Sequence, residues 1–168
     1  MRASIDRNRA DPLIAGPAKR QLVLDTNVVL DWLLFRLPAL DPLRDALSAG
    51  RIVIATHELL FEELRRVLPR PEISRYTTDV GGVIEAYRAQ TAMAPLPPEL
   101  LLSQESLPAG FPHCRDPDDD KFLAFAWHSK SDALVTKDRE VLRLRKRVRS
   151  FGVSILTIED MLGGLETR

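Results

Sequence analysis

The chain has 168 residues, of which 45% are apolar and 29% charged, as is typical of a globular domain with a sizeable core. Its 24 basic and 24 acidic residues give a formal net charge of zero, which excludes a global positive field as an argument for nucleic-acid binding. The single cysteine, Cys114, excludes an intrachain disulfide and a cysteine-rich zinc site, and no apolar run approaches the roughly 18 residues of a membrane span. We therefore expect a cytoplasmic protein that has no membrane segment.

The first twenty residues are mixed polar, contain Pro12 and Pro17, and lack the apolar core of a secretory signal. We expect them to form a flexible N-terminal extension, residues 1–20, ahead of a single domain, residues 21–168. The basic side chains of this extension are candidates for contact with a polyanion, and disorder is the simpler interpretation.

The domain alternates short apolar runs with longer amphipathic segments. The apolar runs predict strands at 22–24, 51–55, 94–96, 133–136 and 153–156. The other segments predict helices at 28–35, 42–49, 57–68, 72–91, 116–129, 140–147 and 158–162, with a helical turn at 99–103. Thr56 is expected to cap the third helix and Gly81-Gly82 to bend the fourth. This alternation predicts a three-layer α/β fold, in which helices cover both faces of a central parallel sheet of about five strands.

A lone carboxylate, Asp25, follows the first apolar run directly and precedes Thr26 and Asn27. A carboxylate at the carboxyl end of a buried parallel strand lies where open α/β sheets bind their ligands. The run at 133–136 ends in the same way, with Thr136 followed closely by Asp138. Taken alone, Asp138 is equally well explained as the cap of the next helix.

Four aspartates occur within five residues, from Asp116 to Asp120. A helix N-terminus favours acids by about 0.3–1 kcal/mol each, which explains one or two of these residues better than four. If the segment is one helix, Asp116 and Asp120 project toward the sheet, whereas Asp118 and Asp119 point elsewhere as ordinary solvated caps. Asp120 is then the strongest functional candidate of the four. For Asp116, a functional role and a structural role are equally well supported.

The helix at 57–68 carries two consecutive glutamates. On a helical wheel Glu63 falls on the shoulder of the apolar arc, whereas Glu62 falls on the polar side. Glu62 also stands four residues before Arg66, the favourable order for a surface ion pair. Glu63 is therefore the carboxylate that we expect to point inward.

These positions give an acid quartet at the ends of strands or at the adjoining helix starts: Asp25, Glu63, Asp120 and Asp138. Gathered at one rim of a sheet, four acids need hard divalent cations, and oxygen ligands select Mg²⁺ or Mn²⁺. Because Mg²⁺ prefers phosphate partners, phosphodiester hydrolysis is the reaction that the quartet favours.

The sequence resembles the PIN-domain ribonucleases. The matching segments are LVLDTNVVL at 22–30, LLFEELRRVL at 59–68, CRDPDDDKFLAFA at 114–126 and DALVTKDREVL at 132–142. They occur in the family's order and are most similar to the toxin components of bacterial type II toxin–antitoxin pairs, which carry an Arg-Asp-Pro-Asp-Asp signature. The resemblance covers residues 21–162.

The resemblance implies an endoribonuclease that depends on Mg²⁺ or Mn²⁺, with RNA as its substrate and a cognate antitoxin as a candidate partner. It implies catalytic and metal-binding roles for the acid quartet, with Asp116 as a further ligand or a supporting group. Asn27 and Thr136 match polar neighbours that orient ligands or water.

Basic residues cluster after the predicted strand at 133–136. Lys137, Arg139 and Arg143 are the candidates for contact with the RNA backbone. A solvated helix surface is the alternative interpretation of this cluster. The apolar helices at 28–35 and 73–93 offer surface for a homodimer or for an antitoxin segment.

Two other functional classes stay open at this point. A catalytically silent binding module would retain the fold, but the intact quartet argues against it. A phospho-aspartate α/β domain also gathers acids and a lysine at strand ends. However, Asn27 stands where an aspartyl phosphatase has its second aspartate, and Asp25 is alone where receiver domains have paired acids.

Overall fold

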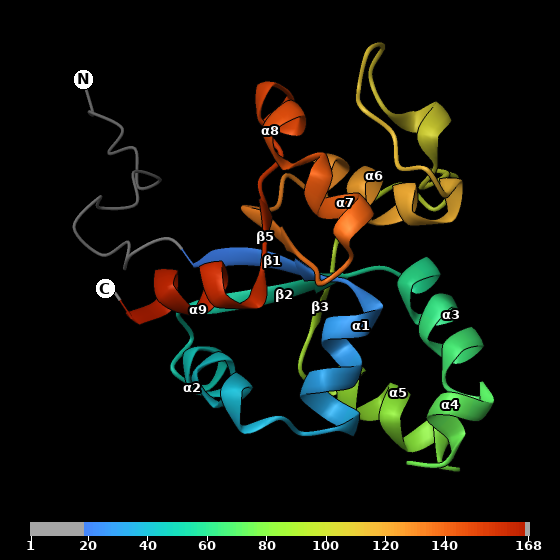
Figure 1. The fold of residues 1–168 in the computed structure, drawn as a ribbon, viewed down its shortest axis with the longest axis vertical. Coiled ribbons are helices and arrows are strands. Elements are labelled where there is room, and N and C mark those ends of the chain that lie inside the picture. The colour runs from blue at the N-terminus through green and yellow to red at the C-terminus, as the bar shows by residue number, and fades with distance from the viewer. Residues whose placement is uncertain (1–18, 167–168) are drawn as a thin grey trace, which may run out of the picture.

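A computed structural model describes residues 19–166 of the chain. Its centre is a five-stranded parallel sheet with the strand order β3-β2-β1-β4-β5 (Figure 1). The strands are β1 Arg20–Leu24, β2 Ile52–Thr56, β3 Ala92–Met93, β4 Ala133–Val135 and β5 Ile155–Leu156. Apart from its last two residues, the predicted flexible extension lies outside the described residues. The sheet begins at Arg20, one residue before the predicted domain boundary.

Helices connect the strands in turn. The α-helices are α1 Thr26–Val29, α2 Asp41–Ser48, α3 Glu58–Val67, α4 Pro71–Ser74, α5 Val80–Ala89, α6 Asp120–His128, α7 Arg139–Arg143, α8 Arg145–Val148 and α9 Ile158–Glu166. A π-helical turn, Leu30–Leu34, follows α1, and 3-10 turns cover Pro38–Leu40, Gln104–Ser106, Pro117–Asp119 and Arg149–Phe151. Across residues 19–166, no helix has the length and apolar character needed to span a bilayer.

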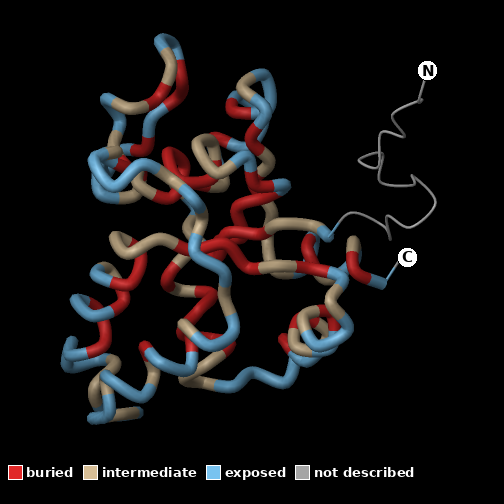
Figure 2. Tube along the Cα trace, turned by 180° about the vertical axis from the view of Figure 1, so that it is seen from behind, coloured by how far each residue is buried: buried red, intermediate tan, exposed pale blue. Residues whose placement is uncertain are grey.

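The central strands supply two hydrophobic cores because successive side chains of a strand point to opposite faces of a sheet. On β1, Leu22 and Leu24 belong to the core beneath α1, α2, α3, α5 and α9, whereas Val23 belongs to the core beneath α6, α7 and α8. On β4, Val135 joins the first core and Leu134 the second. Figure 2 shows burial concentrated along the strands and on the helix faces that turn toward them. The predicted three-layer α/β fold is thus confirmed.

Two of the predicted short elements are displaced. The strand expected at 94–96 is found at Ala92–Met93, where it pairs with the end of β2. The helical turn expected at 99–103 is wrong, since the 3-10 turn lies at Gln104–Ser106. Both errors fall in the proline-rich segment, where no apolar periodicity fixes the boundaries.

The predicted cap of α3 is also wrong. Thr56 is fully buried as the last residue of β2, so it lies in the sheet and not at the helix start. His57 occupies the cap position, where its Nδ1 atom accepts a hydrogen bond from the backbone N–H of Leu59 at 3.3 Å. The strand therefore continues one residue further than its apolar run indicates.

Gly81 and Gly82 do not bend a long helix as predicted. The break comes earlier, between the end of α4 at Ser74 and the start of α5 at Val80, and both glycines lie in the first turn of α5. The Oδ1 atom of Asp79 caps this helix by accepting a hydrogen bond from the backbone N–H of Gly82 at 2.8 Å. A Cβ atom on Gly82 would lie 2.2 Å from Oδ2 of Asp79, so a side chain here would displace the cap.

The two glycines are therefore expected to respond differently to alanine. Gly82→Ala should give no net stabilisation, because loss of the Asp79 cap, about 1 kcal/mol, offsets the gain in helix propensity. Gly81→Ala places its Cβ atom in ordinary contact, 3.8 Å from Asp79 Oδ1, and should stabilise by up to about 1 kcal/mol through helix propensity. Chemical denaturation of the two variants beside the wild type measures both effects. Equal stabilisation by both substitutions would contradict the capping role.

Candidate active site

The carboxyl ends of β1 and β4 lie side by side at the middle of the sheet. Leu24 pairs with Val135 across these strands, and the backbone N–H of Asp25 donates to the carbonyl oxygen of Val135 at 3.0 Å. Beyond this pair, the Thr136 hydroxyl donates to Oδ2 of Asp25 at 2.5 Å and accepts from the backbone N–H of Asp138 at 3.0 Å. Thr136 thus ties together the two aspartates that the sequence placed at neighbouring strand ends.

The environment of Asp25 opposes its ionisation. Burial raises the pKa of this carboxyl, the charge of Asp138 raises it further, and hydrogen bonds from Thr136 and from the backbone of Thr26 and Asn27 lower it in part. The Asn27 side chain also donates to Oδ2 of Asp25 at 3.1 Å. Several hydrogen-bond donors therefore hold the carboxylate, but no basic side chain among the described residues offsets its charge.

Asp138 has two functions in the structure. It caps α7, because its Oδ1 atom accepts a hydrogen bond from the backbone N–H of Glu140 at 2.7 Å. Its charge also raises the pKa of Asp25 and of Asp119, so capping α7 is not its only interaction. Half-buried and oriented by its own helix, Asp138 stays available as an oxygen ligand.

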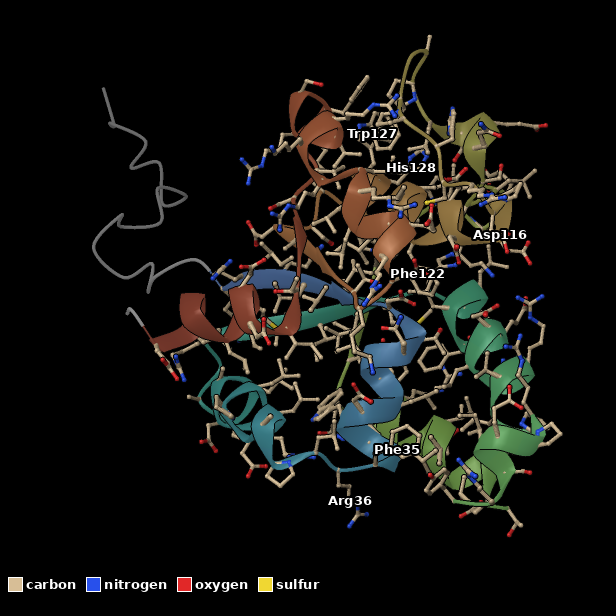
Figure 3. The ribbon with its side chains drawn as sticks, in the orientation of Figure 1. Phe35, Arg36, Asp116, Phe122, Trp127 and His128 are labelled. Carbon is tan, nitrogen blue, oxygen red and sulfur yellow. The ribbon has the colours of Figure 1, made fainter. Side chains whose placement is uncertain are left out.

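The acidic segment departs from the single helix that the spacing predicted. Pro117–Asp119 is a 3-10 turn capped by Asp116, whose Oδ1 atom accepts from the backbone N–H of Asp118 at 3.0 Å, and α6 begins only at Asp120. Asp116 is consequently exposed whereas Asp120 is fully buried, so the expectation that they share one helix face is wrong. Figure 3 shows Asp116 toward the outside and Phe122, two residues into α6, near the point where β1 leads into α1.

Asp120 is anchored by one oxygen only. Its Oδ1 atom accepts a hydrogen bond from the backbone N–H of Cys114 at 2.8 Å. Its Oδ2 atom is buried without a hydrogen-bond partner in the described part of the chain, and the nearest basic atom, Nδ1 of His113, is 3.6 Å away. The pKa of the Cys114 thiol is raised by burial, then by Asp120, and also by the charges of Asp119 and Asp138.

Asp119 is the site residue that the sequence interpretation missed. Asp118 is exposed as expected and pairs with Arg66, but Asp119 is half-buried, and its carboxyl pKa is raised to about 6. Burial is the largest cause, followed by the charges of Asp138, Asp116 and Asp25, while Lys121 acts in the opposite direction. Asp119 therefore lies among the carboxylates, and the expectation that it is a solvated cap is wrong.

The sequence contained a signal for Asp119. Proline is favoured at the first helical position, so Asp116-Pro117 marks a helix that starts at Pro117 with Asp116 as its cap. In the tight 3-10 turn that results, successive side chains are about 120° apart and not 100°, so Asp118 and Asp119 do not take the directions that a wheel of one long α-helix gives them.

Glu63 points inward, whereas Glu62 is exposed, as the helical wheel predicts. However, Arg66 pairs with Glu63 at 2.6 Å, so the expected ion pair between Glu62 and Arg66 is wrong. The Nζ atom of Lys121 lies 2.8 Å from the same Glu63 oxygen. Burial opposes the ionisation of Glu63, but Lys121 and then Arg66 outweigh it and lower the pKa of this carboxyl. Glu63 thus meets cations and not the aspartates.

The basic candidates differ in how freely they can bind a polyanion. The side chain of Lys137 pairs with Asp31 at 2.5 Å, and that of Arg143 pairs with Glu140. Arg139 is exposed, and its side chain has no ion-pair or hydrogen-bond partner within residues 19–166. Of the three, Arg139 is therefore the most available for contact with a phosphate.

The donor chemistry of the aspartates fits a hard divalent cation. Asp25, Asp119, Asp120 and Asp138 offer only oxygen, and Oδ2 of Asp120 is an orphaned buried acceptor. Oxygen donors of this kind select Mg²⁺ or Mn²⁺. Between residues 19 and 166, however, no group of three histidine, cysteine, aspartate or glutamate side chains already converges on one point.

A sequence model of the family described as "PIN domain" matches residues 21–140. The chain belongs to the PIN-domain family. PIN domains are generally nucleases that use divalent metal ions and bind RNA. The matched part of this PIN domain runs from β1 into α7 and includes every aspartate described above. A comparison with curated proteins found no match.

Proposed function

We propose that this PIN domain is a metal-dependent endoribonuclease that hydrolyses RNA phosphodiester bonds. The observation that supports the proposal best is the link through Thr136, whose hydroxyl donates to Oδ2 of Asp25 and accepts from the backbone N–H of Asp138. Beyond burial, the charge of Asp138 raises the pKa of Asp25, and the charges of Asp138, Asp116 and Asp25 raise that of Asp119. Partly buried like charges are unfavourable unless a cation offsets them, which supports a cation-dependent function.

We assign Asp25, Asp119 and Asp138 to hold Mg²⁺ or Mn²⁺, with Asp120 contributing its orphaned Oδ2 atom and Asp116 supporting Asp119 by position. When bound, the ion supplies an activated water and stabilises negative charge that develops on the phosphate. Thr136 and Asn27 orient the Asp25 carboxylate through their hydrogen bonds.

Glu63 enters the proposal at the edge of the site. Its carboxylate pairs with and orients Lys121, and the charge of Lys121 also lowers the pKa of Asp119 in part, so this ammonium acts on both groups of acids. Lys121 is therefore positioned to contact a phosphate of the RNA, and Arg139, which directly follows Asp138, offers a second basic contact.

Cleavage assays with the purified full chain test the proposal. A panel of structured and single-stranded RNAs should be cut in Mg²⁺ or Mn²⁺ and left intact in EDTA, with activity restored when excess metal is returned. Cutting that persists in EDTA would contradict the metal-dependent mechanism. Tight Mn²⁺ binding without any cleavage across the panel would favour the silent binding module in its place.

The finer form of the proposal is that the nuclease acts as the toxin of a toxin–antitoxin pair, as the Arg-Asp-Pro-Asp-Asp signature suggests. Induced expression of the wild type in a bacterial host is then expected to stop growth, whereas Asp25→Asn should be tolerated. Equal growth of the two strains at equal protein levels would refute the toxin role and leave the nuclease proposal to the cleavage assay.

A further inference from the structure

An ion pair between a buried aspartate and an exposed lysine lies beside the proposed metal site and takes no part in the reaction described above. The side chain of Asp31 is only 7% exposed, and its Oδ2 atom lies 2.5 Å from Nζ of Lys137. Asp31 belongs to the π-helical turn after α1, a rare geometry that occurs frequently at functional sites. Burying a carboxylate is unfavourable, so a function is to be sought for it.

Lys137 stands in the chain between two residues of the site, Thr136 and Asp138. Its backbone N–H donates to Oδ1 of Asn27 at 3.4 Å, so the loop after β4 is tied at this residue to the segment that follows Asp25. A lysine at this position has a long, flexible side chain, and the nearby carboxylates attract its ammonium group. The structure nevertheless shows the ammonium on Asp31.

The ion pairs agree with this placement. Among the described residues the Lys137 ammonium pairs with Asp31, and it forms no ion pair with Asp25, Asp119 or Asp138. Because Asp31 retains this ammonium, the space around the three aspartates stays open to an external cation.

We propose that Asp31 is a positioning residue that holds the Lys137 ammonium away from Asp25 and Asp138, so that the lysine does not compete with a divalent cation. The inference rests on the proposed metal-dependent function. If Asp31 is lost, we expect the released Lys137 ammonium to weaken metal binding. The loss of the ion pair itself should not.

Mn²⁺ affinity, measured by isothermal titration calorimetry on the full chain, tests the inference with four variants. Asp31→Asn should weaken Mn²⁺ binding by about tenfold, the factor expected when a unit charge comes within about 6 Å of a divalent ion even at the dielectric constant of water. Asp31→Glu, which keeps the charge, should bind Mn²⁺ within about threefold of the wild type. Lys137→Met should not weaken binding, because the competing ammonium is gone.

The double variant Asp31→Asn/Lys137→Met decides the outcome. It removes both charges and so leaves no uncompensated buried ion, which favours folding even where a single variant unfolds. Wild-type Mn²⁺ affinity in the double variant supports the inference, whereas affinity as weak as in Asp31→Asn overturns it and makes the pair a structural link only. Thermal melting of each variant confirms that the titrated protein is folded.

The failure of this inference is distinguishable from the failure of the proposed function. Wild-type protein that binds no Mn²⁺ would remove the metal-dependent nuclease itself, and the inference with it. Wild-type protein that binds Mn²⁺, together with an unchanged affinity in a folded Asp31→Asn variant, would overturn the positioning role alone.

Discussion

Replacing Asp25 by asparagine is expected to lower RNA cleavage by at least about 100-fold, the scale on which active sites lose rate when one electrostatic contact is removed. The substitution keeps an acceptor for the Thr136 hydroxyl, so the link between β1 and β4 survives. It removes a carboxylate whose ionisation burial and Asp138 oppose, so the metal-free variant should melt at the wild-type temperature or above it. Lost activity with retained stability is the expected signature.

Asp132→Asn is the matched control for this experiment. Asp132 lies at the opposite end of the same pair of strands, where its Oδ2 atom accepts from the backbone N–H of Gln21 at 2.6 Å. This variant should cleave RNA at the wild-type rate, even if its stability falls slightly. Wild-type activity in Asp25→Asn would exclude Asp25 from the machinery and would contradict the central assignment.

Asp119→Asn is expected to have the second largest effect, with Mn²⁺ affinity reduced about 10- to 100-fold and cleavage reduced at least as much. The neighbouring Asp118→Asn is a matched control one residue away, because Asp118 is exposed and pairs with Arg66 on the surface. Titration with Mn²⁺ and initial cleavage rates separate the two variants. Equal losses of Mn²⁺ affinity and cleavage in both variants would show that only the total charge of the segment matters. Wild-type affinity and cleavage in both would remove Asp119 from the site.

The raised pKa of Asp119 adds a pH signature. A proton and a cation compete for this carboxyl, so wild-type Mn²⁺ affinity should rise as the pH passes through about 6, and this rise should be smaller in Asp119→Asn. Without metal the sign for stability is opposite. An acid with a folded-state pKa above its unfolded value contributes stability at low pH that is lost as the pH rises through about 6.

Metal-free Asp119→Asn should therefore melt above the wild type at pH 7.5 by a few degrees, since about 1 kcal/mol corresponds to roughly 2–4 °C in a domain of this size. The difference should shrink as the pH falls below about 6 and disappear near pH 3, where the wild-type carboxyl is largely protonated in both states. A variant less stable than the wild type at pH 7.5 would show that Asp119 serves the fold and not a site.

The sheet was predictable because its strands are apolar runs that end in turn or cap residues. Leu22–Leu24 and Ala133–Val135 are buried on both faces, which produces an uninterrupted apolar signal, and the polar residues after each run mark the rim where ligands bind. The inward direction of Glu63 was predictable for a similar reason, because α3 has one apolar face.

The features that failed depend on local geometry or on distant partners. The half-buried position of Asp119 depends on a 3-10 turn, which changes the angle between successive side chains and which a 3.6-residue periodicity cannot represent. The partner of Lys137 is Asp31, which is distant in the sequence, so no periodicity relates the two residues. Arg66 pairs with Glu63 and not with Glu62, and it also contacts Asp118, a contact between α3 and the turn before α6 that the isolated helix does not contain.

The strand order has a consequence for the moment at which the acids first meet. Asp25 follows β1, near the beginning of the chain, but its neighbours Asp119 and Asp138 come from segments made much later, and β4 reaches β1 only after both have been synthesised. A nascent chain on the ribosome therefore carries isolated carboxylates without a common centre. Under the proposed function, cleavage is therefore expected only near the completion of translation, and an unfinished copy should leave the messenger that encodes it intact.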